Sequence, residues 1–138
     1  PNYCTDFTGP SKQPLKYDNI MYTMHRYIDV TVEKPCENAL LESVVAQGIP
    51  VFVSEWGTSA EEEAVLKSGE YDNEAVTYQE NAKPFIDYMK EHRISWTAWA
   101  LGNKEEAHSM IRSSCDKYSG WTSNDLTDFG RLIFSNFK

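Results

Sequence analysis

Polar and aromatic side chains stand at the ends of three apolar segments of this chain. His25 and Tyr27 end the first segment, Glu55 ends the second, and Trp99 lies near the end of the third. A carboxylic acid can carry out the bond-breaking chemistry, a phenol and an imidazole can form hydrogen bonds, and an indole face can stack on a pyranose ring. Brought together, these groups would be suited to holding a sugar and cleaving its glycosidic bond.

The three segments are predicted to be parallel strands. Residues 20–27, 49–56 and 94–101 are rich in β-branched, aromatic and other apolar residues. Their runs are apolar on both faces, which is typical of strands that are covered on both sides. In parallel α/β barrels the active site lies at the C-terminal ends of the strands, so the polar side chains above would meet at one edge of the sheet.

Helical patterns separate and follow the strands. Residues 36–47 place apolar side chains on one stripe, and Gly48 supplies a C-terminal stop. Residues 81–92 also predict a helix, with Pro84 in its first turn, and residues 125–137 predict a last one. The order strand, helix, strand, helix, strand, helix predicts right-handed βαβ units in a parallel sheet.

The remaining segments and the composition indicate which loops, binding partners and cysteine states to expect. Residues 57–73 are acidic and rich in turn formers, so we expect a long loop, with the run at 61–63 on a solvated face. A net charge of −8 disfavours nucleic acids and anionic membranes as partners, and no apolar run is long enough to cross a bilayer. Cys4, Cys36 and Cys115 predict either one disulfide with a leftover thiol or three buried thiols.

Five motifs together resemble glycoside hydrolase family 5 cellulases. Val-Ser-Glu-Trp-Gly-Thr-Ser, which contains Glu55, resembles the strand that carries the nucleophile in that family. The other four resemble the preceding strand, the last strand, a Lys-x-Glu motif and the closing segment, at residues 21–27, 94–101, 104–106 and 120–127. The motifs run from about Pro14 to the C-terminus in the order and spacing of the family.

The resemblance implies a role for each candidate residue. Glu55 would be the nucleophile of a retaining double displacement, and Tyr27 would donate a hydrogen bond that orients it. His25 would line the subsite that holds the cleaved sugar, and Trp99 would be its stacking floor. The Lys-x-Glu pair would contact hydroxyls of neighbouring glucose units through Lys104 and Glu106.

Other side chains are expected to be structural. Trp96 is predicted to lie in the core, and His92 and His108 are predicted to lie on the surface. Arg26 stands where the family has a buried Phe, so it must either reach solvent or have a partner, because an unpaired buried charge is costly.

The resemblance covers only part of a barrel. A complete (β/α)₈ barrel needs roughly 250 residues, whereas these 138 residues supply three clear strands, with residues 1–7 as the end of a fourth. We therefore predict a single domain, residues 1–138, that is a half-like TIM barrel of three or four parallel strands with covering helices. The Asn-Glu-Pro motif that carries the acid/base in the family is absent. Four acids are candidates to replace it, and no spacing selects among Asp29, Glu61, Glu105 and Glu106.

The leading expectation is a secreted endo-β-1,4-glucanase that needs no metal or organic cofactor, because two carboxylates suffice for the reaction. The alternatives are a non-catalytic glucan-binding module and a fragment that is inactive without its N-terminal half. Two bare sheet edges also predict association, either with further copies of this chain or with an N-terminal fragment of the barrel.

Overall fold

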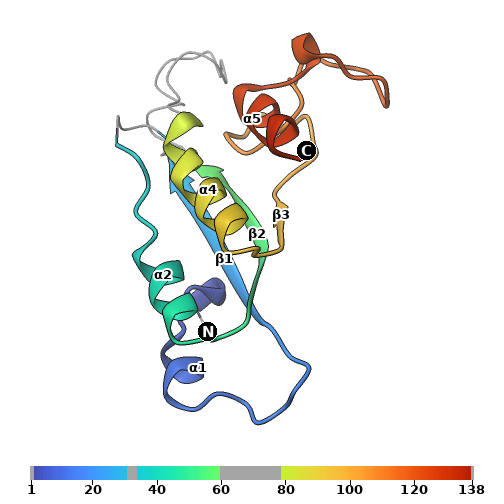
Figure 1. Cartoon of the computed structure of the whole chain (residues 1–138). Helices are drawn as coiled ribbons and strands as arrows, with labels where there is room; N and C mark the ends of the chain where they lie inside the picture. The colour runs from blue at the N-terminus through green and yellow to red at the C-terminus, as the bar shows by residue number, and fades with distance from the viewer. Residues whose placement is uncertain (1, 31–33, 60–78, 138) are drawn as a thin grey trace.

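A parallel sheet in the strand order β1-β2-β3 organises the structure (Figure 1). The computed structural model describes residues 2–30, 34–59 and 79–137. Its strands are β1 (Tyr22–Asp29), β2 (Val51–Ser59) and β3 (Trp96–Ala98). The predicted parallel order is confirmed, although β3 is much shorter than the apolar run that predicted it.

Three helices confirm the predicted βαβ alternation: α2 (Ala39–Ala46), α4 (Lys83–Glu91) and α5 (Asp128–Asn136). Pro84 lies in the first turn of α4, as predicted, where its missing N–H has no intrahelical acceptor. Gly48 follows α2 with a φ of 70°, a conformation that favours glycine and stops the helix. The side chain of Thr127 caps α5 by accepting a hydrogen bond from the Gly130 N–H at 3.0 Å.

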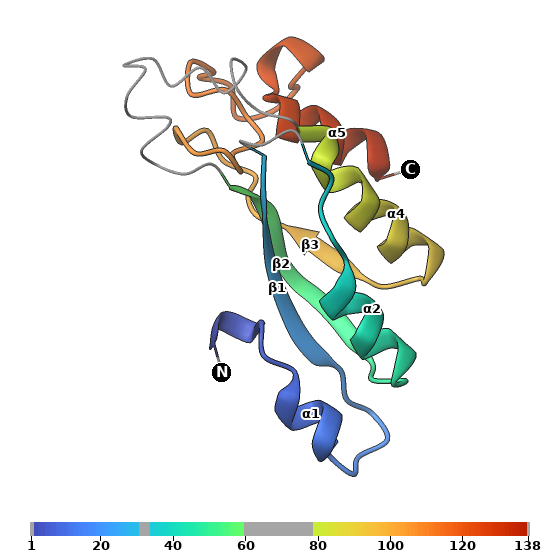
Figure 2. The same ribbon diagram turned by 90° about the vertical axis from the view of Figure 1, so that its left-hand side faces the viewer.

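The helices lie along one face of the sheet (Figure 2), and the apolar core forms between them and the strands. Trp56 of β2 is fully buried at its centre. Its ring makes edge-on contacts, with centroids 5.6 to 5.7 Å apart, to Phe85 of α4, Trp96 of β3 and Phe129 of α5. Trp96 thus packs against the core, as predicted, although its side chain is only partly buried. The buried side chains include those of Met24, Ile28, Leu41, Val44, Val53, Ile86, Met89 and Ile133.

The opposite face of the sheet is open in the described residues. On β1, Thr23, Tyr27 and Asp29 are exposed and His25 is half-buried, while the residues between them point toward the helices. We had expected strands covered on both faces, and this expectation was wrong for the described part of the chain. In a closed barrel the second face is filled by side chains from the other strands. We call this surface, with Glu55 of β2, the open face.

Two further expectations differ from the structure. The N-terminal residues contain no strand: they form a 3-10 turn η1 (Asn2–Cys4) and a short helix α1 (Thr8–Lys12). The predicted loop at 57–73 begins later, because Gly57–Ser59 still pair with β1, and residues 60–73 lie outside the described residues. The predicted fold class, a partial TIM barrel of three or four parallel strands, is confirmed with three strands in the described residues.

The structure answers two questions that the sequence left open: whether Arg26 has a partner, and whether the cysteines are paired. Arg26 is half-buried and has a partner, since its Nη2 donates to the Glu37 carbonyl at 3.4 Å. Cys4, Cys36 and Cys115 are unpaired, and each is half-buried. None of the helices in the described ranges combines the length and apolarity that a bilayer span requires.

Candidate functional site

A β-bulge in β2 sets the position of Glu55. Met24 pairs with Val53, but the next residue of β1, His25, pairs with Glu55, so Ser54 is the extra residue. The bulge allows both Val53 and Trp56 to be buried although they are three positions apart. As a result, Glu55 lies directly beside His25 on the open face.

Two side chains of β1 lie beside the Glu55 carboxylate. Tyr27 donates a hydrogen bond from its hydroxyl to Glu55 Oε1 at 2.9 Å. His25 Nδ1 lies 3.9 Å from the same oxygen, and its Nε2 lies 3.2 Å from Ser54 Oγ. The side chain of Glu55 remains 28% exposed, so the carboxylate is oriented by the protein and still accessible to a ligand.

The electrostatic environment keeps Tyr27 a donor. Burial, the hydrogen bond to Glu55 and the negative charges of Glu55 and Glu106 raise the pKa of Tyr27 well above its usual range. The phenol is therefore protonated throughout the neutral range and continues to donate to the carboxylate.

Gly57 is the point at which three parts of the site converge. A Cβ at this position would lie 2.6 Å from the Trp99 carbonyl oxygen, 2.9 Å from His108 Cβ and 3.3 Å from Tyr27 Cε1. No side chain fits there without displacing the backbone of the third strand segment. The glycine therefore lets β2 approach both Trp99 and His108 closely.

The backbone holds Trp99 in place while its indole stays accessible. The Trp99 N–H donates to the Trp56 carbonyl at 2.7 Å, and the following Ala100 N–H donates to the His108 carbonyl at 2.9 Å. The side chain is 49% exposed. An indole that is fixed at its backbone and open on its surface is the arrangement that a sugar-stacking platform needs.

A series of contacts through His108 connects Lys104 and Glu106 to the same site. Lys104 Nζ lies 3.9 Å from Glu106 Oε1, and His108 Nε2 lies 2.9 Å from Glu106 Oε2. The His108 ring contacts the Tyr27 ring edge-on, with centroids 5.6 Å apart. We had predicted His108 to be a surface residue, whereas it is half-buried within the site. Its place two residues after Glu106 was the signal in the sequence that could have identified it.

The structure thus brings together Glu55, Tyr27 and His25, and it connects Glu106 to them through His108. Of the four acids that were candidates to replace the acid/base, Glu106 is the one whose charge also acts on the pKa of Tyr27. Glu61 lies outside the described residues. Within residues 2–30, 34–59 and 79–137, no group of three or more His, Cys, Asp or Glu side chains could hold a metal ion.

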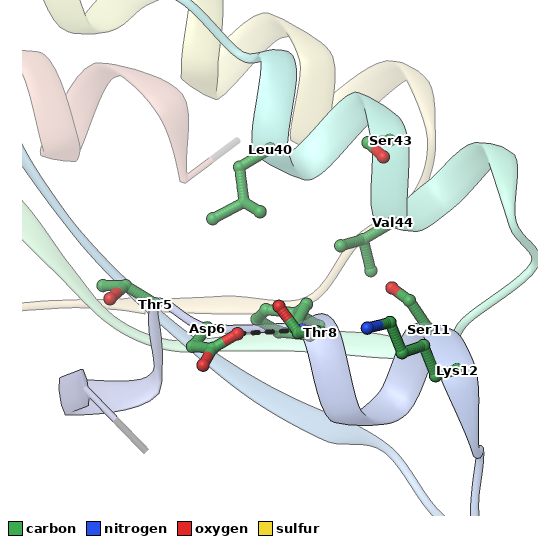
Figure 3. Close-up of a pocket in the computed structure, with 9 residues that line it drawn as sticks. Thr5, Asp6, Thr8, Ser11, Lys12, Leu40, Ser43 and Val44 are labelled. Carbon is green, nitrogen blue, oxygen red and sulfur yellow. Dashed lines mark hydrogen bonds between the residues drawn. The ribbon is translucent and has the colours of Figure 1, made fainter.

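Two grooves lie away from this site. One, of about 530 Å³, separates the N-terminal segment from α2 near the beginning of the strands (Figure 3). It is lined by Thr5, Asp6, Phe7, Thr8, Ser11, Lys12, Leu40, Ser43 and Val44. The other, of about 270 Å³, lies between Leu101 and Trp121. Neither of these two grooves is lined by Glu55 or Tyr27.

Comparisons with known proteins identify the family and the fold of the chain. A family model described as cellulase (glycosyl hydrolase family 5) matches residues 1–105. An endoglucanase of Clostridium saccharobutylicum is 36% identical over 120 residues, which are 87% of this chain and 24% of that protein. A solved structure from Cytophaga hutchinsonii superposes with a TM-score of 0.68 at 26% identity, over 94% of this chain and 38% of that one.

The catalytic domain of an endoglucanase from Thermobifida fusca superposes with a TM-score of 0.64 at 25% identity, over 91% of this chain and 37% of that chain. The chain spans about a quarter of the length of the curated relatives it matches. The three strands and their helices therefore form a partial (β/α)₈ barrel, the fold class that the sequence predicted.

Proposed function

This chain belongs to the cellulase family, glycosyl hydrolase family 5, and we propose that it carries the nucleophile of a retaining enzyme that cleaves β-1,4-glucan chains. One observation carries the proposal: Glu55 accepts a hydrogen bond from Tyr27 at 2.9 Å while remaining accessible on the open face. The relatives named endoglucanases support the substrate class.

The proposed reaction is a double displacement at Glu55. A carboxylate oxygen attacks the anomeric carbon while the bond from that carbon to the leaving oxygen breaks, and the leaving oxygen takes the bonding electron pair and a proton. Water then attacks the glycosyl ester, gives up a proton, and releases Glu55 and a sugar of unchanged anomeric configuration. Tyr27 orients the carboxylate for the first step.

Four residues are proposed to hold the sugar chain. His25 would contact the ring at which cleavage occurs, and Trp99 would stack beneath it. Lys104 and Glu106 would bind hydroxyls of a neighbouring glucose unit, since both side chains reach solvent. Because a β-glucan polymer is found outside cells, we also propose that the protein is secreted.

The proton for the leaving oxygen has no assigned donor in this chain. A retaining site needs a second carboxyl group about 5–5.5 Å from the nucleophile, and the Asn-Glu-Pro motif is absent from the sequence. We propose that the donor comes from beyond these residues, through association at the outer edges of β1 and β3 with the rest of a barrel or with another copy. If no donor is supplied, the second candidate function is a glucan-binding module without turnover.

The test uses a substrate whose leaving group needs no proton. With 2,4-dinitrophenyl β-cellobioside, the unaltered chain should release a burst of about one equivalent of dinitrophenolate, because Glu55 can act alone in the first step. Glu55→Gln should abolish the burst, whereas Glu91→Gln, at the exposed end of α4, should leave it unchanged. Equal bursts in the unaltered chain and the Glu55 variant would exclude Glu55. Retention on insoluble cellulose without any burst would favour the binding module.

A further inference from the structure

We propose that His108 is a positioning residue that connects the sugar-binding Lys104–Glu106 pair to the Tyr27–Glu55 pair. The inference rests on the function proposed above, because it describes how two parts of that site act on each other. Three sets of contacts carry it: those from His108 to Glu106, to Tyr27 and to the strand backbone.

The first contact fixes Glu106. His108 Nε2 lies 2.9 Å from Glu106 Oε2, while Lys104 Nζ lies 3.9 Å from the other carboxylate oxygen. The Glu106 side chain is still 41% exposed. A carboxylate oxygen has more than one lone pair, so Glu106 can accept hydroxyl hydrogen bonds from a sugar while His108 sets its direction.

The second contact fixes Tyr27. The two rings meet edge-on, with centroids 5.6 Å apart and an interplanar angle of 70°. His108 Cβ is also within 2.9 Å of the place that a Cβ on Gly57 would occupy. His108 therefore lies close to β2 through its Cβ and contacts the Tyr27 ring through its imidazole, which limits the directions in which the phenol can turn away from Glu55.

Hydrogen bonds hold the backbone around His108 to two neighbouring segments. Its carbonyl accepts from the Ala100 N–H at 2.9 Å, directly after Trp99, and the Ala107 carbonyl accepts from Thr58 Oγ1 at 2.7 Å. Thr58 is fully buried in β2. A displacement of this segment would therefore move the surroundings of Trp99 and Tyr27 together.

These contacts have a functional consequence. A glucose unit bound by Lys104 and Glu106 would stabilise the arrangement in which His108 holds Tyr27 toward Glu55. Binding of a unit that does not itself react would then accelerate attack at the reacting unit, which is the use of remote binding energy for catalysis.

The experiment compares a one-unit and a two-unit trapping reagent. The reagents are 2,4-dinitrophenyl 2-deoxy-2-fluoro-β-glucoside and the corresponding cellobioside. The fluorine slows both displacements and the good leaving group restores the first, so the glycosyl ester on the nucleophile accumulates. For each reagent one measures the maximal trapping rate and the half-saturating concentration. The ratio of cellobioside to glucoside efficiency reports how much the second glucose unit contributes.

Two substitutions separate the two functions of the imidazole. His108→Gln keeps an N–H that can donate to Glu106 but removes the ring, so we expect the maximal trapping rate to fall about tenfold with both reagents. His108→Phe keeps a ring against Tyr27 but removes the donor to Glu106, so we expect its larger effect, a loss of about tenfold, in the cellobioside-to-glucoside ratio. The matched controls are His92→Gln and His92→Phe, because His92 is exposed at the end of α4. Neither control should change either quantity.

His108 variants that trap like the unaltered chain would overturn the inference. So would an equal loss in both variants with an unchanged ratio, since that result describes a merely structural residue. Absence of trapping in the unaltered chain would contradict the proposed function instead. In that case the ¹³Cζ NMR signal of Tyr27 in the unreacted chain decides the inference: His108→Gln should shift this signal more than His108→Phe, and an unmoved signal would overturn the connection.

Discussion

Tyr27 donates a hydrogen bond from its hydroxyl to Glu55 across two neighbouring strands, although the residue opposite Tyr27 in register is Gly57. The hydrogen bond therefore runs diagonally over the open face, to the side chain two residues before the paired position. Such a diagonal is within reach of a long aromatic side chain. It forms because Gly57 leaves the space over which the Tyr27 ring lies.

Removal of the phenolic hydroxyl should slow the first displacement without unfolding the protein. In Tyr27→Phe the ring contact with His108 can persist, but Glu55 loses a hydrogen bond to a charged acceptor, worth about 1.5–3 kcal/mol. We expect the dinitrophenolate burst to be roughly 10- to 100-fold slower. The control is Tyr17→Phe, whose hydroxyl belongs to an exposed side chain. Equal burst rates in the unaltered chain and in both variants would show that the Tyr27 hydroxyl does not contribute to the first displacement.

A methyl group at Gly57 should damage the site and the fold together. Gly57→Ala would place a Cβ 2.6 Å from the Trp99 carbonyl oxygen, so that the strand or the segment at Trp99 has to move. Overpacking of this kind costs about 1–3 kcal/mol. Urea unfolding and the burst rate should both show the loss. Gly102→Ala, which meets no atom within 4 Å, should change neither, and an unaffected Gly57 variant would contradict the described close approach.

Trp99 should contribute to sugar binding more than to stability, because its side chain is 49% exposed. We expect Trp99→Ala to weaken binding of a soluble cello-oligosaccharide by about tenfold, with little change in the unfolding midpoint. Isothermal titration calorimetry measures the first quantity. Tyr118→Ala serves as the comparison, since Tyr118 is an almost fully exposed aromatic outside the site. Undiminished binding in Trp99→Ala would argue against the stacking platform.

Acid should loosen the closing segment around η3 (Ser123–Asp125). Hydrogen bonds from Lys117, and then from the backbone and hydroxyl of Thr122, hold the pKa of Asp125 well below its usual range. A carboxyl whose pKa is lowered by folding stabilises the protein above its unfolded pKa, near 3.9, and that contribution is lost as the pH falls below this value. Asp125→Asn should therefore be less stable at neutral pH and respond less to acid.

Denaturation midpoints between pH 2.5 and 6 test this prediction, with Asp116→Asn as the control because Asp116 is exposed on the same segment. Parallel curves for the Asp125 variant and the unaltered chain would show that the hydrogen bonds of Asp125 contribute nothing to acid stability.

The sequence was sufficient to predict the order of the three described strands and of helices α2, α4 and α5, and the residues at the strand ends. Apolar runs separated by amphipathic helices identified the parallel order, and Gly48 and Pro84 correctly marked a helix end and a helix start. Glu55, Tyr27 and His25 follow from strand polarity, because parallel strands bring their C-terminal ends to one edge. These features depend on local pattern and direction alone.

The remaining features depend on contacts between distant segments. Nothing in the composition of residues 51–59 indicates that Ser54 is an extra residue, yet this bulge decides which face Glu55 occupies. His108 was assigned to the surface because a lone histidine in a polar segment carries no periodic signal. Its burial arises from Tyr27, 81 positions earlier in the chain. The open face was also missed, because an apolar run does not say what will cover it.

The location of the trapped sugar decides whether Glu55 is the nucleophile. After reaction with the fluorinated cellobioside, proteolysis and tandem mass spectrometry identify the modified residue. We predict a single fluorocellobiosyl ester on Glu55 and no adduct in Glu55→Gln. An adduct on any other residue, or an undiminished adduct in the Glu55 variant, would contradict this prediction.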